Sequence, residues 1–334
     1  MKVSVFRKLF CQYRAFRRGG RSPVFVSWHV TGRCNLRCRQ CFFFGRMRPL
    51  GPDLDTESCV RVVDQIAELQ IPFLYFGGGE PLLREDLCAI ASRAKAKGLR
   101  TFLFTNGTLI SAELARSVAQ AFAAVYVSLD GARTSHDSQR GPGAFDRTMA
   151  GIANLLVWRK ATQVNLNIRV DAGNAFQLGE MFEKAARLGI HQIQLHPYFE
   201  PENRVEAEQA SAIEQELLRL RALHPRLVDG TAEYLRGLSR YLSNDCDIQC
   251  QAATMIHPAI LPDGRVSACC TFPAILGDLR RQPLRNILET AAVAPEAFAA
   301  CAGCYRQDYT EVTRLFRNPW RAALPVNLVR AMDH

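Results

Sequence analysis

The chain has 334 residues, of which 48% are hydrophobic and 22% are charged, and its formal net charge is +10 at neutral pH. This composition can bury a sizeable core as one large domain, or as one domain with an appendage, and it excludes a disordered chain. No secretory signal pattern and no apolar run long enough to cross a bilayer stand out in the sequence. The twelve cysteines therefore indicate metal binding in a reducing cytoplasm rather than disulfides.

The excess of positive charge favours an anionic partner, which charge alone does not identify. Residues 1–22 carry basic side chains and no acidic one. Their apolar positions recur at helical spacing and predict an amphipathic helix. Such a helix either lies on an anionic membrane surface or packs its aromatic stripe across the end of the main domain. The stripe consists of Phe6, Leu9, Phe10, Tyr13 and Phe16.

An apolar run at 24–30 is followed by Cys34, Cys38 and Cys41, in the spacing C-x3-C-x2-C. Iron-sulfur clusters are normally held by four cysteine thiolates, so a compact set of three leaves one iron open to a small molecule. Structural zinc sites usually pair one C-x2-C with a second, which this spacing fits poorly. The arginines between the cysteines argue against a set of core residues. The spacing therefore favours an iron-sulfur cluster over zinc or no metal.

Beyond this point, short apolar runs alternate with helical patterns, such as the helix that begins near Asp55 and the helix that begins at Ser111. This alternation predicts parallel βα units and an α/β fold. Six units are too few to close an eight-stranded barrel, so we expect a partial (β/α)6 TIM-like barrel with reactive groups at the carboxyl ends of its strands. The expected strands are 24–30, 73–76, 101–105, 125–129, 164–170 and 193–198.

Polar residues follow several of these strands. A glycine pair lets a ligand approach the backbone, and an adjacent carboxylate can pair with an ammonium group, although a glycine run alone is more often a tight turn. Ser128 and Asp130 point the same way on their strand, so they bind a ribose or cap the next helix. Arg140 is either a ligand contact or a surface ion pair, and His196 is either a ligand contact or a satisfied core residue. The other strand-end residues are Gly78, Gly79, Glu80, Thr105 and Asn106.

A second set of cysteines lies toward the C-terminus. The turn Pro262-Asp263-Gly264 predicts a β-hairpin between 256–261 and 265–268. A hairpin with cysteines near its ends, closed by a later C-x2-C, makes a plausible four-thiolate site, and spacing alone leaves zinc and iron-sulfur open. The cysteines of this set are Cys246, Cys250, Cys269, Cys270, Cys301 and Cys304.

The order of the first motifs resembles that of the radical S-adenosylmethionine (SAM) superfamily. The resemblance implies that Cys34, Cys38 and Cys41 are the catalytic centre and bind a 4Fe-4S cluster whose open iron takes SAM. Reduction of the cluster then yields a 5′-deoxyadenosyl radical that abstracts hydrogen from a substrate. Gln40 stands where the family commonly has an aromatic residue. The implied SAM contacts are Gln40, Gly78, Gly79, Glu80, Thr105, Asn106, Ser128, Asp130 and Arg140.

The C-terminal cysteines resemble the SPASM extension of that superfamily, or its shorter twitch form. The resemblance implies a small cysteine-rich β-hairpin and helix extension with one auxiliary 4Fe-4S cluster that serves electron transfer. Cys246 and Cys270 are alternates. The implied ligands are Cys250, Cys269, Cys301 and Cys304.

The expected organisation has five parts, which are a basic helix at 1–22, a radical SAM partial barrel at 23–199, a helical bridge at 200–245, an auxiliary cluster domain at 246–310 and a basic apolar tail at 311–334.

The sequence thus predicts a radical SAM enzyme that receives electrons from a donor such as flavodoxin or ferredoxin. About twenty residues before the first strand leave no room for a peptide-recognition domain, which favours a small-molecule, sugar-like, nucleotide or lipid-linked substrate. A peptide-modifying enzyme with a separate recognition partner is the alternative. A non-catalytic iron-sulfur and zinc redox sensor is an alternative of another class. Scattered arginines predict no nucleic-acid partner. The basic, apolar segments 1–22 and 311–334 suggest a cytoplasmic protein with peripheral membrane contact.

Overall fold

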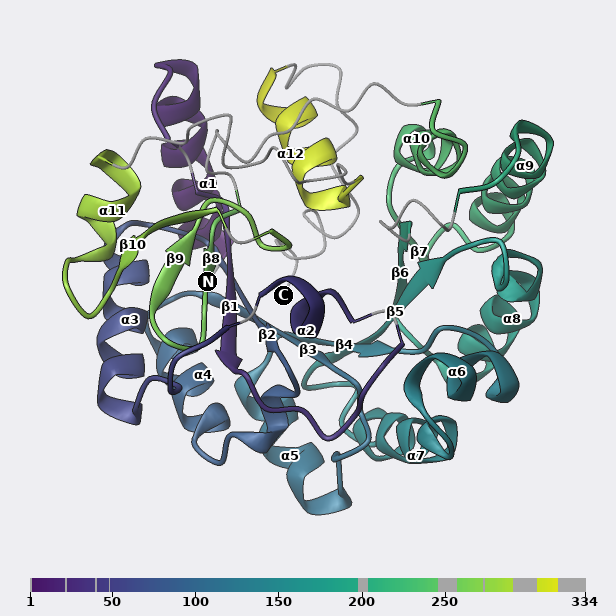
Figure 1. Ribbon diagram of the computed structural model, residues 1–334, viewed down its shortest axis with the longest axis horizontal. Coiled ribbons are helices and arrows are strands. Elements are labelled where there is room, and N and C mark those ends of the chain that lie inside the picture. The colour runs from purple at the N-terminus through teal and green to yellow at the C-terminus, as the bar shows by residue number, and fades with distance from the viewer. Residues whose placement is uncertain are drawn as a thin grey trace.

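The computed structural model contains one ten-stranded sheet, curved into an open barrel, with helices around its outside (Figure 1). The strand order is β10-β9-β8-β1-β2-β3-β4-β5-β6-β7. The structure describes residues 2–21, 23–39, 41–47, 49–197, 204–245, 257–272, 274–290 and 305–317.

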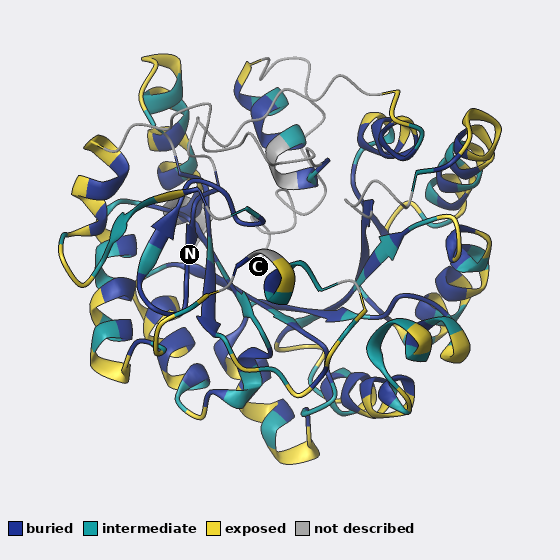
Figure 2. Cartoon of the chain, viewed as in Figure 1, coloured by how far each residue is buried: buried dark blue, intermediate teal, exposed yellow. Residues whose placement is uncertain are grey.

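The six predicted strands are present and each pairs in parallel with the next, which confirms the α/β partial-barrel prediction. The outward side chains of these strands are apolar and pack beneath the surrounding helices, while the outer helix faces are exposed (Figure 2). The strands are β1 (Phe25–Thr31), β2 (Phe73–Gly78), β3 (Arg100–Thr105), β4 (Ala124–Ser128), β5 (Gln163–Val170) and β6 (Gln192–Pro197).

Helices connect these strands, and short-range signals fix where several of them begin. Asp55 accepts a hydrogen bond from the Ser58 backbone N–H at 2.7 Å, and the Ser111 side chain accepts one from the Leu114 N–H at 3.1 Å. These are the N-caps that the sequence predicts. The helices are α2 (Phe42–Arg46), α3 (Thr56–Glu68), α4 (Leu87–Ala96), α5 (Ala112–Ala121), α6 (Arg133–Arg140), α7 (Ala144–Leu156) and α8 (Leu178–Leu188), with short 3-10 turns η1 (Pro81–Leu83) and η2 (Ala175–Gln177).

The C-terminal part extends the same sheet. The predicted hairpin is confirmed, since β8 (Ala259–Ile260) and β9 (Arg265–Ser267) pair antiparallel. Strand β8 also pairs in parallel with β1, where Ser27 lies opposite Ala259. The hairpin is therefore continuous with the barrel. The remaining elements are α9 (Ala207–Leu223), β7 (Val228–Asp229), α10 (Ala232–Leu242), β10 (Ile275–Asp278), α11 (Leu284–Thr290) and α12 (Gln307–Arg317).

Helix α1 (Lys2–Arg17) packs against the edge of the barrel where the strands begin. Leu9, Tyr13 and Phe16 join an aromatic cluster there, whereas Phe6 and Phe10 are each 56% exposed. The predicted stripe therefore packs only in part: Leu9, Tyr13 and Phe16 contact the barrel, whereas Phe6 and Phe10, at the margin of the stripe, stay exposed. Among the described residues, no helix combines the length and hydrophobicity needed to cross a bilayer.

Candidate active site

A cavity of about 260 Å³ lies at the carboxyl ends of β1 to β6. Residues from the cysteine loop and from the turns after β2, β3 and β4 line it together, as the barrel prediction requires. His196, at the end of β6, also lines this cavity. The predicted site residues that line it are Cys34, Cys38, Cys41, Gly78, Gly79, Thr105, Asn106, Ser128, Asp130 and Arg140.

The glycines after β2 allow the cysteine loop to approach that strand. The Gly79 N–H donates to the Thr31 carbonyl at 3.0 Å, and the Glu80 N–H donates to the Arg33 carbonyl at 2.8 Å. A Cβ atom on Gly79 would lie 2.0 Å from the Arg33 carbonyl oxygen, and one on Gly78 would lie 2.7 Å from that of Thr31. Only glycine fits at these two positions, so the end of β2 holds the start of the cysteine loop in place.

The Glu80 side chain lies beneath the cavity and does not line it. It is fully buried, and its carboxylate accepts hydrogen bonds from the Thr105 hydroxyl at 2.7 Å, the Asn106 N–H at 2.8 Å and the Leu82 N–H at 3.1 Å. Burial raises the pKa of Glu80, and these three donors act in the opposite direction. Glu80 therefore connects the end of β2 to the turn after β3 instead of presenting its carboxylate to the cavity.

An amide pair ties the cysteine loop to the same turn. The Asn106 Nδ2 donates to Asn35 Oδ1 at 2.9 Å, and Asn35 Nδ2 donates to the Thr108 hydroxyl at 2.8 Å. Asn35 follows Cys34 directly, so this pair fixes the loop at its first cysteine. Nothing in the sequence singled out Asn35.

Asp130 is the buried anion of the cavity. Its carboxylate accepts from Arg140 Nε at 2.7 Å and lies 3.5 Å from Arg169 Nη2. Burial alone would raise the pKa of Asp130, but the charges of Arg140 and Arg169 outweigh it and hold the pKa well below its usual range. The backbone N–H of Asp130 donates to His136 Nδ1 at 3.3 Å. Arg140 therefore forms a buried ion pair and not a surface one.

Sequence reasoning missed several residues that line the cavity. Asn167 and Arg169 alternate along β5 with buried apolar residues, and this alternation is the signal that could have revealed them. Aromatic residues from the short helix α2 cover another side of the cavity. Cys270, predicted as an alternate ligand of the auxiliary cluster, also lines this cavity. The lining residues not predicted are Ser27, His29, Phe42, Phe43, Tyr75, Gly77, Phe104, Asn167, Arg169, Pro197 and Arg306.

The inner face of β5 and β6 carries buried amides whose hydrogen-bonding capacity the described residues do not fill. The register places Asn165 beside Gln192 and Asn167 beside Gln194. Within the described residues, several side-chain atoms here have no hydrogen-bond partner, namely Asn165 Nδ2 and Oδ1, Asn167 Oδ1, Gln192 Nε2 and Gln194 Oε1.

The three cysteines of the first set are free thiols around the cavity. Burial raises the pKa of Cys34 and of Cys38; the charges of the neighbouring cysteines add to this, while Arg140 opposes it at Cys38. Bound iron would relieve this mutual repulsion, and the chemistry of three thiols, the cysteines that line the described part of the cavity near this loop, fits a cluster with one open iron. Across the described residues, no group of three or more His, Cys, Asp or Glu side chains, these cysteines included, is arranged to hold a metal ion.

Of the second cysteine set, the structure describes Cys269 and Cys270, and both are buried. The Thr271 N–H lies 3.4 Å from the Cys269 sulfur and the Thr271 hydroxyl lies 3.3 Å from it. Hydrogen bonds from Cys270 and Thr271 hold the pKa of Cys269 well below its usual range despite burial. A stabilised thiolate of this kind fits an iron ligand. The predicted site residues outside the described residues are Gln40, Cys246, Cys250, Cys301 and Cys304.

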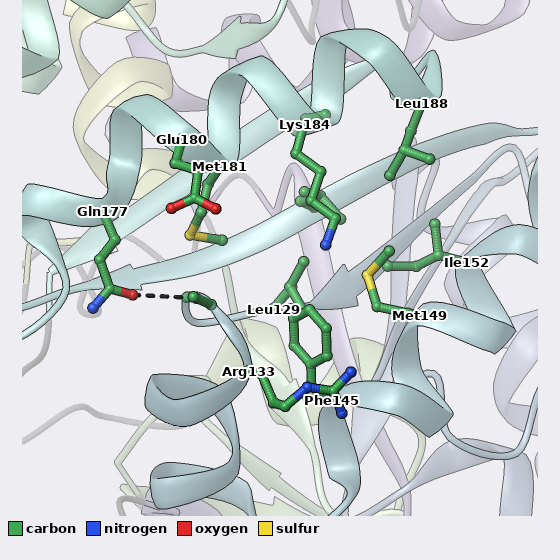
Figure 3. Close-up of a pocket in the computed structure, with 14 residues that line it drawn as sticks. Leu129, Arg133, Phe145, Met149, Ile152, Gln177, Glu180, Met181, Lys184 and Leu188 are labelled. Atoms are coloured by element: carbon green, nitrogen blue, oxygen red, sulfur yellow. Dashed lines mark hydrogen bonds between the residues drawn. The ribbon is translucent and has the colours of Figure 1, made fainter.

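A second hollow, of about 140 Å³, lies on the outside of the barrel between α7, α8 and the turn after β4 (Figure 3). Phe145 lies between two cations, with Lys184 Nζ at 4.8 Å and the Arg133 guanidinium carbon at 5.1 Å from its ring centre. Gln177 Oε1 accepts from the Ala132 N–H at 3.2 Å. None of the predicted site residues lines this hollow.

Comparison with known families agrees with the motif order. The model of the radical SAM superfamily matches residues 28–156, and that of the SPASM iron-sulfur cluster-binding domain matches residues 250–305. The AdoMet-dependent heme synthase of Methanosarcina barkeri is 30% identical over 332 residues, which cover 86% of this chain and 93% of that protein. The chain belongs to the radical SAM superfamily. As a member it is an enzyme that uses SAM and a 4Fe-4S cluster as cofactors. Its SPASM domain binds additional iron-sulfur.

Other relatives of this radical SAM enzyme match over a shorter range. The mycofactocin maturase MftC of Mycobacterium tuberculosis is 33% identical over 176 residues, which are 52% of this chain and 44% of MftC. Two solved structures share the fold at low identity. Streptococcus suis SuiB bound to SAM has a TM-score of 0.65 at 14% identity, covering 81% of this chain and 64% of SuiB. The enzyme anSMEcpe with bound AdoMet has a TM-score of 0.65 at 16% identity, covering 93% of this chain and 99% of that one.

Proposed function

We propose that this enzyme abstracts hydrogen from a small molecule that carries carboxylates. The observation behind the proposal is that three free cysteines and the polar ends of β2 to β6 converge on one cavity. When bound, the reduced 4Fe-4S cluster supplies the electron that splits SAM into methionine and a 5′-deoxyadenosyl radical. We assign the cluster to Cys34, Cys38 and Cys41.

The residues around the cavity suggest how SAM is held. Gly78 and Gly79 line the cavity and suit the methionine end, and Glu80 acts as a positioning residue that fixes the Thr105–Asn106 turn. Ser128 and Asn167 are neighbours in register and suit the ribose hydroxyls. Gln40 is proposed to contact SAM on the strength of its position in the motif alone.

Two features suggest the class of substrate. Among the described lining residues, Asp130 is the single carboxylate, whereas Arg140, Arg169 and Arg306 are all cationic. The apolar part of the lining is largely aromatic, from Phe42, Phe43, Tyr75 and Phe104. An anionic molecule with a flat apolar surface, such as a tetrapyrrole, suits this lining. The similarity to a heme synthase over most of its length also supports this class.

We further propose that residues 23–199 cleave SAM, that 200–245 form a helical bridge and that 246–310 hold one auxiliary 4Fe-4S cluster, which passes electrons from a donor such as flavodoxin or ferredoxin. Its proposed ligands are Cys250, Cys269, Cys301 and Cys304, with Cys246 and Cys270 as alternates. The hydrogen bonds to the Cys269 sulfur support this assignment.

Anaerobic reconstitution with reductant tests the radical chemistry. We expect the reconstituted chain to release 5′-deoxyadenosine from SAM. The C34A/C38A/C41A variant should release none, and its iron and sulfide content should be lower by the amount in one cluster. Cys11→Ser, at an exposed cysteine, is the matched control and should retain both. A triple variant with wild-type SAM cleavage contradicts the assignment.

The substrate class is tested with Fe-coproporphyrin III and its tetramethyl ester, which differ in their charged carboxylates. We expect the acid, and not the ester, to increase deoxyadenosine release, and Arg306→Gln to raise its apparent KM about tenfold. A peptide substrate with a recognition partner is the second candidate, supported by the match to MftC. Stimulation by such a peptide and by no carboxylate-bearing small molecule would overturn the first proposal.

A further inference from the structure

Among the described residues, helix α1 contacts the barrel through one side. Leu9, Tyr13 and Phe16 pack into the aromatic cluster at the edge where the strands begin, and the Tyr13 ring centre lies 5.7 Å from that of Phe316 in α12. Lys8 Nζ donates to the Gly98 carbonyl at 2.9 Å. These contacts fix the rotation of the helix, so the side chains of its opposite face have a defined direction.

The solvent-exposed side of α1, which we call its outer face, combines apolar and basic side chains. Phe6 and Phe10 lie one turn apart and are each 56% exposed. The Arg14 guanidinium carbon lies 5.9 Å from the ring centre of Phe10. No acidic residue occurs in residues 1–22. The exposed arginines of this helix and of the residue after it are Arg7, Arg14, Arg17 and Arg18.

This face differs from the other exposed apolar positions of the described residues. Those positions are single and lie on separate elements, at Val157, Phe176, Leu223 and Ile275. Isolated exposed apolar residues are normal on any protein surface. Two exposed aromatic rings one turn apart, on a helix whose described exposed charged residues are arginines, suit a bilayer interface, where the rings enter the acyl boundary and the arginines contact anionic headgroups.

We propose that the outer face of α1 binds the surface of a membrane that contains anionic lipids. The helix lies in the plane of the interface, with Phe6 and Phe10 inserted and the barrel above it. An anionic bilayer matches both features of this face at once, because it offers negative charge across a surface and an apolar layer directly beneath. The proposal does not depend on the reaction that the enzyme performs.

The position of α1 also predicts the orientation of the bound enzyme. The helix contacts the loops before β2 and β3, since Gln12 Nε2 donates to the Leu69 carbonyl at 3.2 Å and Lys8 reaches Gly98. The cavity lies at the opposite ends of the same strands. A membrane under α1 therefore leaves the mouth of the cavity open, and vesicles should not compete with SAM.

Co-sedimentation of the full-length holoenzyme with vesicles tests the proposal. We expect the wild type to pellet with phosphatidylcholine vesicles that contain phosphatidylglycerol, and to stay in solution with phosphatidylcholine alone. F6S/F10S should lower the partition coefficient about tenfold. Arg7→Gln and Arg14→Gln should each lower it about fivefold, with less difference between variants in high salt.

Phe176→Ser is the matched control, because Phe176 is also exposed but lies in η2, far from α1 in the chain. It should pellet as the wild type does, and all variants should keep the wild-type far-ultraviolet circular dichroism and SAM cleavage. Equal pelleting of F6S/F10S and the wild type overturns the proposal, as does failure of the wild type to bind anionic vesicles. Binding of α1 to a protein partner without binding to vesicles overturns it in favour of a protein interface.

Discussion

The inner wall of the barrel has two unlike halves. From β1 to β4 it is aromatic, and its rings contact one another, as between Phe104 and Tyr126 at 4.7 Å and between Phe25 and Phe73 at 5.2 Å. On β5 and β6 it is built from amides such as Asn165 and Gln192, which are buried with atoms that no described residue satisfies. The first half is filled largely by ring packing, whereas in the second half the described residues leave hydrogen-bonding groups that water or a bound molecule could complete.

The largest effect should come from the aromatic half. Phe73 is 1% exposed and packs between Phe25 and Phe102. We expect Phe73→Ala to lower the free energy of unfolding by about 4 kcal/mol, because it removes a fully buried ring and leaves a cavity between Phe25 and Phe102. Urea unfolding of the apoprotein measures this, and Phe176→Ala at an exposed ring should cost almost nothing. If Phe73→Ala lowers the free energy of unfolding no more than Phe176→Ala does, the aromatic half does not stabilise the fold as we expect.

The second largest effect on stability should come from the junction of the two halves, which we call the seam and which consists of Asp130, Arg140 and Arg169. Asp130 follows the end of β4, and Asp130→Asn leaves the largely buried Arg140 and Arg169 beside a neutral group, so we expect a loss of about 3 kcal/mol in the free energy of unfolding. The exposed pair of Asp146 with Arg133 is the matched control, and Asp146→Asn should change stability little.

The same seam predicts a dependence on pH. Because the folded pKa of Asp130 is depressed, its contribution is complete above the unfolded value, about 4, and is lost as the pH falls below it. Asp130→Asn should show less of this acid-induced loss than the wild type. If the free energy of unfolding falls equally with decreasing pH in both proteins, the ion-pair assignment is contradicted.

A smaller effect concerns His136, which is fully buried behind the seam. Burial lowers the pKa of His136 to about 4; Arg140 adds to this, and Asp130 and Asp137 oppose it. The folded state therefore resists protonation, and stability present above about pH 6.5 should fall by about 2 kcal/mol at about pH 5. His136→Gln keeps an acceptor for the Asp130 N–H and should remove this slope. A slope that persists in the variant would assign it to another group.

The smallest effect should come from the amide half. Asn165 has neither its donor nor its acceptor satisfied by a described residue, so Asn165→Leu should raise the free energy of unfolding by about 1 kcal/mol in the unliganded protein. Asn167→Leu, at the cavity, should instead weaken SAM or substrate binding without much change in stability. A clear destabilisation by Asn165→Leu would indicate that ordered water already completes that site.

The sequence predicts the strands well because apolar alternation and helix caps are local signals, as at Asp55 and Ser111. The sequence does not predict helix α6, because this helix is polar and has no apolar stripe; His136 is its one buried residue. The parallel pairing of β8 with β1 joins residues more than 200 positions apart and depends on two residues only, so no local pattern indicates it.

For the site, motif order predicts which residues meet, but not the direction of each side chain. Glu80 follows a strand end, where alternation no longer fixes the direction, and its carboxylate turns beneath the cavity toward Thr105. Asn35 contacts Asn106 across 71 positions, and such a contact follows from the fold alone. Arg169 could have been predicted as a site residue, because it continues the inward alternation of β5.

The pairing of β8 with β1 has a consequence for how this protein can be divided. Strand β1 lies between β2 and β8, so a version that ends before residue 257 would expose the backbone N–H and C=O groups of β1 along a free edge. Unpaired strand edges recruit other chains. The barrel without its C-terminal hairpin should therefore self-associate, and the two regions are best expressed, crystallised and engineered as one unit.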